Sequence, residues 1–185
     1  RPAHEGWKGK WASSTTQFVA GGADESDLEL LSTTARGYSD LGLARTYFMA
    51  FNPVPDTPME NKSPTPALRE LRLYQASFLL RDYGFDLEEL PFAADENLPL
   101  PTDPKEAWAE LHLKHNPIEV NDASPRDLLR VPGVGPKRVK KILAARRIRK
   151  LRDLSQLKKL GIATKRAAPF ILLSGRRAAQ QARLF

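Results

Sequence analysis

The chain has 185 residues, 28% of them charged, a formal net charge of +7 and no cysteine. This length suits one domain of ordinary size plus a small one, or two modest domains. Without cysteine the chain cannot form a disulfide, a zinc-thiolate site or a cysteine-ligated iron–sulfur cluster. It also lacks the roughly 18 to 20 consecutive apolar residues of a membrane helix and the pattern of a secretory signal, so we expect a soluble, cytoplasmic protein.

The charge is divided sharply along the chain. Residues 1–110 hold 10 Lys and Arg against 18 Asp and Glu, a net charge of −8, whereas residues 111–185 hold 19 against 4, a net charge of +15. A segment this basic attracts polyanions, with nucleic acid as the leading candidate and an anionic membrane surface as the second. A solvated basic surface without a partner is the plainer alternative, because charge alone is a weak indicator of function.

The acidic half begins with a strand, a helix and a second strand. Residues 16–20 and 45–51 carry the β-branched and aromatic residues of buried strands. Asp24 or Ser26 can cap the helix between them, and we expect two glycines to stop it, Gly37 and Gly42. Two strands joined through a helix predict a parallel pair with helices packed on the sheet, a βαβ unit.

A proline-rich loop follows the second strand. Residues 52–66 contain five prolines, which disfavour regular structure. Because ligands commonly bind at the carboxyl ends of parallel strands, the loop is a candidate rim of a binding site. A connector stiffened by proline explains the same composition, and the sequence leaves both interpretations open.

A longer helix and a linker complete the acidic half. Apolar spacing predicts a helix over residues 67–83, and its arginines are expected on a solvated face: Arg69, Arg72 and Arg81. Residues 86–104 mix acids and prolines and are interpreted as a linker wrapped on a surface. A short helix is expected over residues 105–113. No third ligand accompanies the two histidines found here, so no metal site is expected from His112 and His115.

Two short helices joined by a glycine-rich turn open the basic half. Ser124 can cap the first helix in a capping box with Asp127. This helix cannot pass Pro132, and Pro136 begins a second helix that runs to about Arg147. The Gly-x-Gly turn between them brings free backbone N–H groups and the positive end of the second helix dipole to one place, where glycine lets a phosphate approach the backbone.

This turn and the cations after it form a candidate phosphate clamp. The pattern offers backbone amides and mobile cations but no cluster of Asn, Gln or Arg aimed at base edges, so we expect binding without sequence preference. A turn whose lysines only add solubility is the alternative. The candidate DNA-binding residues are Gly133, Val134, Gly135, Lys137, Arg138, Lys140 and Lys141.

A weaker copy of the same pattern follows. A leucine repeat over residues 151–157 predicts a third helix, residues 160–162 take the place of the turn, and residues 164–173 predict a fourth helix kinked at Pro169. The second turn has one glycine, so we expect it to be a packing partner first and a phosphate site second. Four short helices of this kind share one core. Residues 176–185 are expected to form a basic tail.

Two stretches of the basic half resemble the helix-hairpin-helix family: VNDASPRDLLRVPGVGPKRVKKILAAR and, as a degenerate second copy, LRDLSQLKKLGI. The resemblance covers about residues 119–173. It implies that the hairpin backbone at Gly133–Gly135 grips a DNA phosphate regardless of sequence, often with a monovalent cation on the hairpin carbonyls. Lys137 and Arg138 match the basic positions that flank the hairpin in that family.

Two stretches of the acidic half carry a second resemblance: TTQFVAGGADESDLELLSTTARGYSDLGLARTYFMAFNPVPDTPMEN and LRELRLYQASFLLRDYGF. They resemble the C-terminal part of radical-SAM proteins of DNA modification or repair, which end in a helix-hairpin-helix module and tend to accompany a uracil-DNA-glycosylase-like protein. This resemblance implies S-adenosylmethionine and a 4Fe-4S cluster, held by a Cys-x3-Cys-x2-Cys loop, as cofactors of the parent protein. That loop is missing from these residues.

One pair of residues matches a cofactor motif of that family. Gly21 and Glu25 match its G-x3-E half, although Gln17 stands where the earlier glycine would be, so we expect only a remnant of an S-adenosylmethionine pocket. The chain opens on Arg1 and has no cysteine to hold a cluster. We therefore expect a piece of a longer enzyme that binds DNA but is inactive alone.

These observations predict an α+β protein, in which a partial α/β segment of a radical-SAM barrel precedes an all-α tandem helix-hairpin-helix domain. The expected divisions are residues 1–90 for the barrel segment, 91–116 for a linker with a short helix, 117–175 for the DNA-binding domain and 176–185 for the tail. The alternative function is a non-enzymatic adaptor that recruits a repair partner to DNA. RNA or membrane binding has less support, because surface aromatics and an amphipathic anchor helix are lacking.

Overall fold

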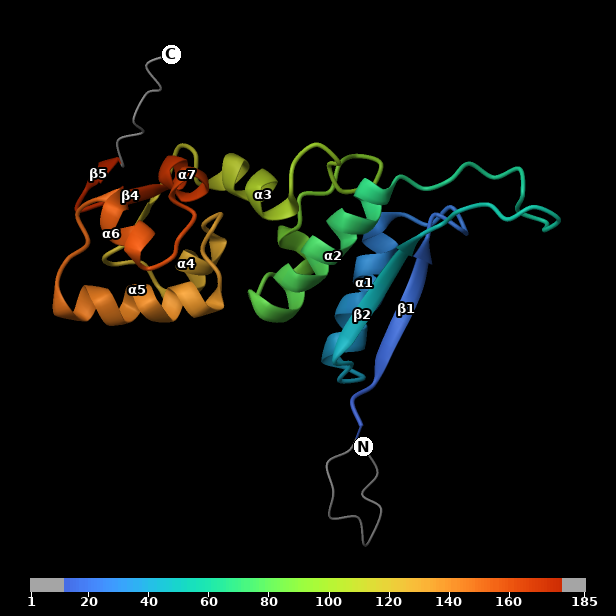
Figure 1. Ribbon diagram of the computed structural model, residues 1–185, viewed down its shortest axis with the longest axis horizontal. Coiled ribbons are helices and arrows are strands. Elements are labelled where there is room, and N and C mark those ends of the chain that lie inside the picture. Colours follow the sequence, from blue (N-terminus) through green and yellow to red (C-terminus); the bar gives the residue numbers. More distant parts are fainter. Residues whose placement is uncertain (1–11, 178–185) are drawn as a thin grey trace, which may run out of the picture.

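The N-terminal strands and helices form a βαβ unit. The computed structural model describes residues 12–177, and its first elements are β1 (Thr15–Ala20), α1 (Asp27–Ser39), β2 (Arg45–Ala50) and α2 (Ala67–Asp82). The two strands pair in parallel, with Thr15 opposite Arg45 and Ala20 opposite Ala50. The parallel pair predicted from the sequence is therefore confirmed (Figure 1).

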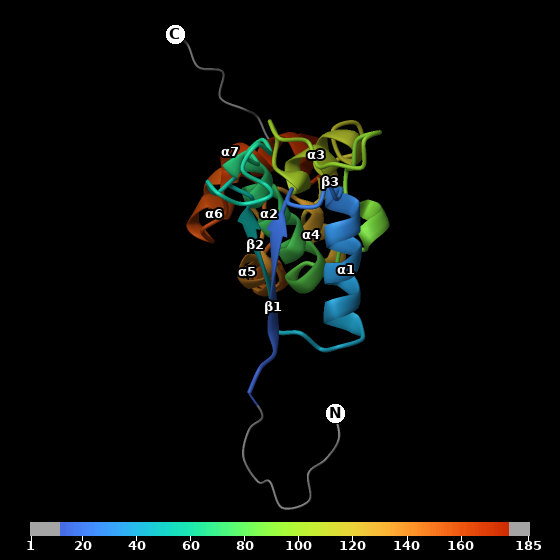
Figure 2. The same ribbon diagram turned by 90° about the vertical axis from the view of Figure 1, so that its right-hand side faces the viewer.

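Helices α1 and α2 cover one face of the strand pair (Figures 1 and 2). Phe48 of β2 packs there in a buried cluster with Leu31 of α1 and Leu73 of α2. Side chains alternate between the two faces of a strand, and the residues of the other face are exposed within residues 12–177: Gln17, Val19, Tyr47 and Met49.

The start of α1 follows the predicted cap, but its end does not follow the predicted stop. Ser26 and Glu29 form a capping box, in which the Glu29 amide donates to Ser26 Oγ at 3.2 Å and the Ser26 amide donates to Glu29 Oε2 at 2.8 Å. The helix passes Gly37 and ends at Ser39, so the prediction that Gly37 stops it is wrong. Gly37 packs closely against Leu43 of the returning chain, because a Cβ on it would lie 2.8 Å from Leu43 Cδ1.

Two arginines predicted on a solvated face of α2 are instead held inside the N-terminal region. Arg72 is 8% exposed and donates from Nε and Nη2 to the Leu100 carbonyl, at 2.9 and 2.6 Å. Arg69 Nε donates to the fully buried Asp27 at 2.7 Å. Asp27 also accepts from the Leu98 amide at 2.9 Å. The segment over residues 86–104 therefore belongs partly to the core, with Leu98 buried, rather than only wrapping a surface.

The C-terminal region consists of short helices closed by a small sheet. A 3-10 turn, η1 (Leu87–Glu89), leads to α3 (Pro104–His112). The elements that follow are β3 (Ile118–Glu119), α4 (Pro125–Arg130), α5 (Pro136–Ile148), α6 (Leu154–Lys159), α7 (Thr164–Ala167), the 3-10 turn η2 (Ala168–Phe170), β4 (Ile171–Leu173) and β5 (Arg176–Arg177). The chain is thus of mixed α and β structure, and its C-terminal region is mainly helical, as expected.

The predicted fourth helix over residues 164–173 is wrong in its second half. The α-helix stops at Ala167, Pro169 lies in the 3-10 turn, and the chain continues as β4. This strand pairs in parallel with β3, where Ile118 lies opposite Ile171, and antiparallel with β5. The domain is therefore not purely α-helical. Residues 171–173 pair instead with β3, which lies more than fifty residues earlier in the chain. Residues 178–185 of the predicted tail lie outside the described residues.

Two buried hydrophobic clusters meet at one tryptophan. The N-terminal cluster draws on residues from Ala20 to Leu98, and the C-terminal cluster on residues from Ala109 to Leu173. Trp108 of α3 packs against both clusters, and its ring makes an edge contact with Phe85 at 5.7 Å between centroids.

Within residues 12–177, none of the helices combines the length and apolar character needed to cross a membrane.

Candidate nucleic-acid interface

The turn between α4 and α5 is closed by its own backbone and packed on both sides. The Val134 amide donates to the Val131 carbonyl at 3.1 Å, and Gly133 adopts a φ of 79°, which favours glycine. A Cβ at Gly133 would lie 2.9 Å from the Ala163 carbonyl oxygen, and one at Gly135 would lie 3.0 Å from the Tyr83 hydroxyl. Gly133 is therefore required by its backbone conformation and by the neighbouring Ala163 backbone, whereas Gly135 lies against the end of the Tyr83 side chain.

The helices on either side of the turn begin as predicted. Ser124 and Asp127 form the predicted capping box at the start of α4, and Pro136 occupies the first turn of α5 with Gly135 as the N-cap. The amides of Arg138 and Val139 both donate to the Gly135 carbonyl, at 2.8 and 3.0 Å. Val134 is buried in the C-terminal cluster and anchors the turn.

Three backbone amides at this turn have no acceptor among residues 12–177. They belong to Gly133, Gly135 and Lys137. A polar group left unpaired at a helix start needs water or a ligand, and the positive end of the 13-residue helix α5 favours an anion at this place.

The predicted basic residues of α5 differ in their contacts within the described part of the chain. Lys137, Lys140 and Lys141 are exposed, and no carboxylate of the described part of the chain forms an ion pair with them. Arg138 is also exposed, but its Nε donates to the Gly161 carbonyl in the second turn at 2.9 Å. The three lysines are thus available to a polyanion, while Arg138 also links the two hairpins.

The second turn packs against the first, as the sequence analysis expected. Gly161 adopts a φ of 83°, and its amide donates to the Lys158 carbonyl at 2.9 Å. Nothing lies within 4 Å of a Cβ placed on Gly161, in contrast to Gly133. Three lysines of the second hairpin are also exposed: Lys158, Lys159 and Lys165.

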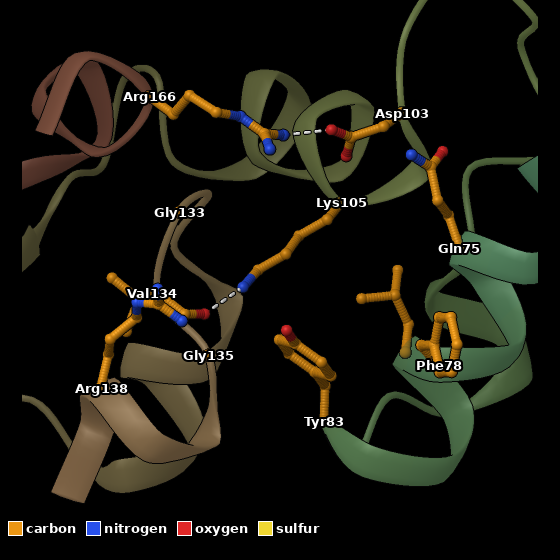
Figure 3. Close-up of a pocket in the computed structure, with 11 residues that line it drawn as sticks. Gln75, Phe78, Tyr83, Asp103, Lys105, Gly133, Val134, Gly135, Arg138 and Arg166 are labelled. Carbon is orange, nitrogen blue, oxygen red and sulfur yellow. Dashed lines mark hydrogen bonds and ion pairs between the residues drawn. The ribbon is translucent and has the colours of Figure 1, made fainter. Parts of the chain in front are cut away.

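A pocket of about 300 Å³ lies beside the first turn. Figure 3 shows it between the end of α2, the start of α3 and the hairpin. Aromatic and amide side chains come from α2 and the residue that follows it, and the charged groups come from α3 and its N-cap, α5 and α7. The residues that line the pocket include Phe78, Tyr83, Asp103, Lys105, Arg138 and Arg166.

Lys105 is the residue of this pocket that sequence reasoning missed. Its side chain crosses the pocket toward the hairpin (Figure 3), and its Nζ donates to the Val134 carbonyl at 2.6 Å. Burial lowers the pKa of Lys105 to about 7, with Asp103 opposing the shift and Arg166 and Arg130 adding to it. The only signal in the sequence is a lysine in the first turn of a helix, where the helix dipole disfavours a cation.

The acidic half contacts the basic half through a buried arginine. Arg130 is 3% exposed and donates to both carboxylate oxygens of Glu89, at 3.0 and 2.6 Å. It also donates to the carbonyls of Tyr83 and Gly84, at 3.1 and 2.8 Å, and lies 3.7 Å from the Phe85 ring centroid. Burial would raise the pKa of Glu89, but hydrogen bonds and the charges of Arg130 and Arg126 lower it overall.

Other arginines also form ion pairs between the two halves. Arg126 pairs with Asp86 at 2.9 Å, and Arg166 pairs with Asp103 and with Glu106. Among the described residues, the acidic half therefore neutralises arginines of the contact region and leaves the lysines of α5 without carboxylate partners.

A second pocket lies at the carboxyl ends of β1 and β2, under the proline-rich loop. It has a volume of about 430 Å³ and contains both Gly21 and Glu25. The Glu25 carboxylate accepts from the amides of Gly21 and Ala23, the latter at 2.9 Å. Burial would raise the pKa of Glu25, but these amides and Arg69 lower it. The structure thus brings the predicted pair together, and their assignment to S-adenosylmethionine stays a prediction.

The chain does not fit an iron–sulfur cluster by itself. It contains no cysteine, and within residues 12–177 no group of three or more His, Cys, Asp or Glu side chains is placed to hold a metal ion. His112 instead stacks near Trp108, with 4.5 Å between ring centroids.

Comparison with known proteins identifies the C-terminal region. A family model described as the helix-hairpin-helix motif matches residues 113–171. No curated protein and no solved structure matches the chain. The matched residues begin directly after α3 and end at the first residue of β4, so they include both turns described above. Residues 113–171 therefore form a helix-hairpin-helix motif, a motif generally associated with DNA binding that does not depend on sequence.

Proposed function

We propose that this protein binds DNA through backbone phosphates, with the turn at Gly133–Gly135 as the central contact. The observation that supports this most directly is the combination of three unpaired amides at the start of α5 and three exposed lysines on the same helix. Amides at a helix start bind phosphate oxygens, and unpaired lysines add the attraction that dominates protein–DNA affinity.

Amide side chains near the turns support binding without sequence preference. Asn121 donates from Nδ2 to the Leu151 carbonyl at 2.9 Å and accepts from the Leu151 amide at 2.8 Å. Gln156 completes the capping box of Asp153 at the start of α6 and accepts from the Arg152 amide at 2.7 Å. These side chains serve the fold, and phosphate contacts by themselves carry no sequence information.

The test is a titration of fluorescein-labelled DNA duplexes of unrelated sequence with the whole chain, at several salt concentrations. We expect similar affinity for each duplex and a steep loss of affinity with rising salt. Strong preference for one sequence, or affinity that does not change with salt, would contradict the proposal.

We further propose that the βαβ unit belongs to a larger α/β barrel of the radical-SAM class. Parallel strands are usually covered on both faces, whereas here Val19, Tyr47 and Met49 are exposed on one face within the described residues. The pocket that joins Gly21 and Glu25 lies at the strand ends where α/β proteins bind ligands. In this proposal, cysteines of the parent protein would hold the 4Fe-4S cluster. S-adenosylmethionine, when bound, would supply the radical chemistry of the parent enzyme.

The competing proposal is an adaptor without catalytic activity, whose acidic half docks a repair protein such as a uracil-DNA-glycosylase-like partner. The coding sequence upstream of Arg1 distinguishes the two. A Cys-x3-Cys-x2-Cys motif there supports the radical-SAM parent. An upstream sequence that lacks this motif, together with a 185-residue chain that stays monomeric in sedimentation, supports the adaptor, since a barrel segment should aggregate through its open strand edges.

A further inference from the structure

Lys105 places a positive charge inside the hairpin. It belongs to α3, outside the two helices that form the turn, and lies 29 residues before Val134 in the sequence. Its Nζ donates to the Val134 carbonyl at 2.6 Å and lies 4.5 Å from the centroid of the Tyr83 ring. The residue is 8% exposed, so packing fixes the position of its side chain.

The Lys105 ammonium already contacts the Val134 carbonyl of the turn. The helix-hairpin-helix resemblance implies a monovalent cation on hairpin carbonyls, and Val134 is the residue between the two glycines of the turn. The Val131 carbonyl is also engaged, because it accepts from the Val134 amide at 3.1 Å. An ammonium group carries the same single charge as a sodium or potassium ion and can donate hydrogen bonds to carbonyl oxygens.

We propose that Lys105 is the built-in cation of this hairpin: its ammonium replaces a bound monovalent metal ion, and thereby holds the turn in its phosphate-binding conformation. The proposal rests on the DNA binding proposed above. Lys105 acts as a positioning residue, since it contacts the carbonyl side of the turn and not the unpaired amides. Because the ammonium is covalently attached to the chain, the hairpin does not depend on which salt is present.

Three charged groups act on Lys105, namely Asp103, Arg130 and Arg166. Asp103 favours the ammonium, and Arg130 and Arg166 disfavour it. The other two titratable groups of the pocket are Tyr83 and Arg138. Burial is the largest influence and lowers the pKa of Lys105 to about 7.

The experiment compares cations at equal ionic strength. Binding of a labelled duplex to the whole chain is measured at pH 6.5 in sodium, potassium and N-methylglucamine chloride, the last being too large to enter the turn. We expect equal affinities for the natural chain within about twofold. For Lys105→Met we expect about tenfold weaker binding in N-methylglucamine chloride, with partial recovery in potassium or sodium chloride, because a metal ion can then reach the Val134 carbonyl. Lys114→Met, a change of an exposed lysine that pairs with Glu110, serves as the control and should bind alike in all three salts.

Two results would overturn the inference: natural-chain binding that requires sodium or potassium, or Lys105→Met binding that equals the natural chain in all three salts. Loss of binding by the natural chain in every salt would instead contradict the proposed DNA binding. In that case, a nitrogen-15 spectrum recorded without DNA still tests the role of Lys105 through the amide signals of Gly133 and Gly135. They should be insensitive to potassium in the natural chain at pH 6.5 and become sensitive in Lys105→Met, or in Lys105→Gln if the methionine variant does not fold. Potassium-sensitive signals in the natural chain at pH 6.5, or insensitive signals in the folded Lys105 variant, would refute the role of Lys105.

Discussion

Arg138 of the first hairpin donates a hydrogen bond from Nε to the carbonyl oxygen of Gly161 in the second hairpin, at 2.9 Å. The same two turns approach each other at Gly133 and Ala163, where a Cβ on Gly133 would lie 2.9 Å from the Ala163 carbonyl. The turns are therefore held together as one surface. These contacts fix the position of the first turn relative to the second.

The lysines of α5 should each contribute to affinity without affecting specificity. Replacing Lys140 or Lys141 by alanine is expected to weaken binding equally for all duplexes and to lower the slope of log affinity against log salt by about 1 for each lysine, because each releases counterions from one phosphate. Fluorescence anisotropy at several salt concentrations measures both quantities. Lys114→Ala is the matched control, and an equal effect of that exposed, paired lysine would argue against a defined site on α5.

The two positive-φ glycines of the hairpins should differ in their response to alanine. Gly161→Ala is expected to cost roughly 1–2 kcal/mol of unfolding free energy, since only the left-handed backbone is unfavourable there. Gly133→Ala should cost about 1–3 kcal/mol more, because the new Cβ also crowds the Ala163 carbonyl. Urea denaturation measures the difference. Equal costs would mean that the two turns are not packed as described.

Arg130 should stabilise the contact between the two halves far more than Arg126 does. Removing one partner of a buried ion pair typically costs about 3–5 kcal/mol, so we expect Arg130→Ala to unfold at much lower urea concentration. Arg126→Ala, which breaks an exposed pair with Asp86, should cost less than about 1 kcal/mol. Similar losses for the two variants would contradict the buried contact.

The same contact predicts a dependence of stability on acid. The pKa of Glu89 is lower in the folded chain than its ordinary value of 4.5. Its stabilising contribution is therefore present above pH 4.5 and is lost as the pH falls through the lower, folded value. The difference in unfolding free energy between the natural chain and Glu89→Gln should shrink on acidification from pH 6 to pH 3. A difference that stays constant over this range would contradict the assignment.

Lys105 should make stability and DNA binding respond to alkali in opposite directions. Its pKa is about 7 in the folded chain against an ordinary value of 10.5, so between these values the unfolded chain binds more protons and stability rises with pH. DNA binding should weaken over the same step and take up a proton near pH 7.5. Calorimetry of DNA binding in buffers of different ionisation enthalpy measures this uptake, which should disappear in Lys105→Met.

Local signals in the sequence predicted most of the elements. The cap at Ser26, one of two candidates in the sequence, the capping box at Ser124, the proline at the start of α5 and the glycine turn at Gly133 act within a few residues, and the structure contains each of them. The parallel pairing of β1 and β2 also followed, because a helix between two strands constrains their direction.

The features that could not be predicted depend on partners far away in the chain. Residues 171–173 form a strand because Ile118 offers a parallel partner, which local propensity does not reveal. Arg69 and Arg72 are held inside by Asp27 and the Leu100 carbonyl, and not on the solvated face that their spacing suggested. The contact of Lys105 with Val134 was missed for the same reason, because it joins a helix and a turn that only the tertiary fold brings together.

The most direct test of phosphate binding at the hairpin is the salt dependence of duplex affinity for the natural chain and for a variant that combines Lys137→Ala, Lys140→Ala and Lys141→Ala. We predict that the natural chain loses affinity steeply with salt and that the slope of log affinity against log salt falls by about 3 in the triple variant, equally for duplexes of unrelated sequence. An unchanged slope and affinity in a triple variant that remains folded would contradict this account.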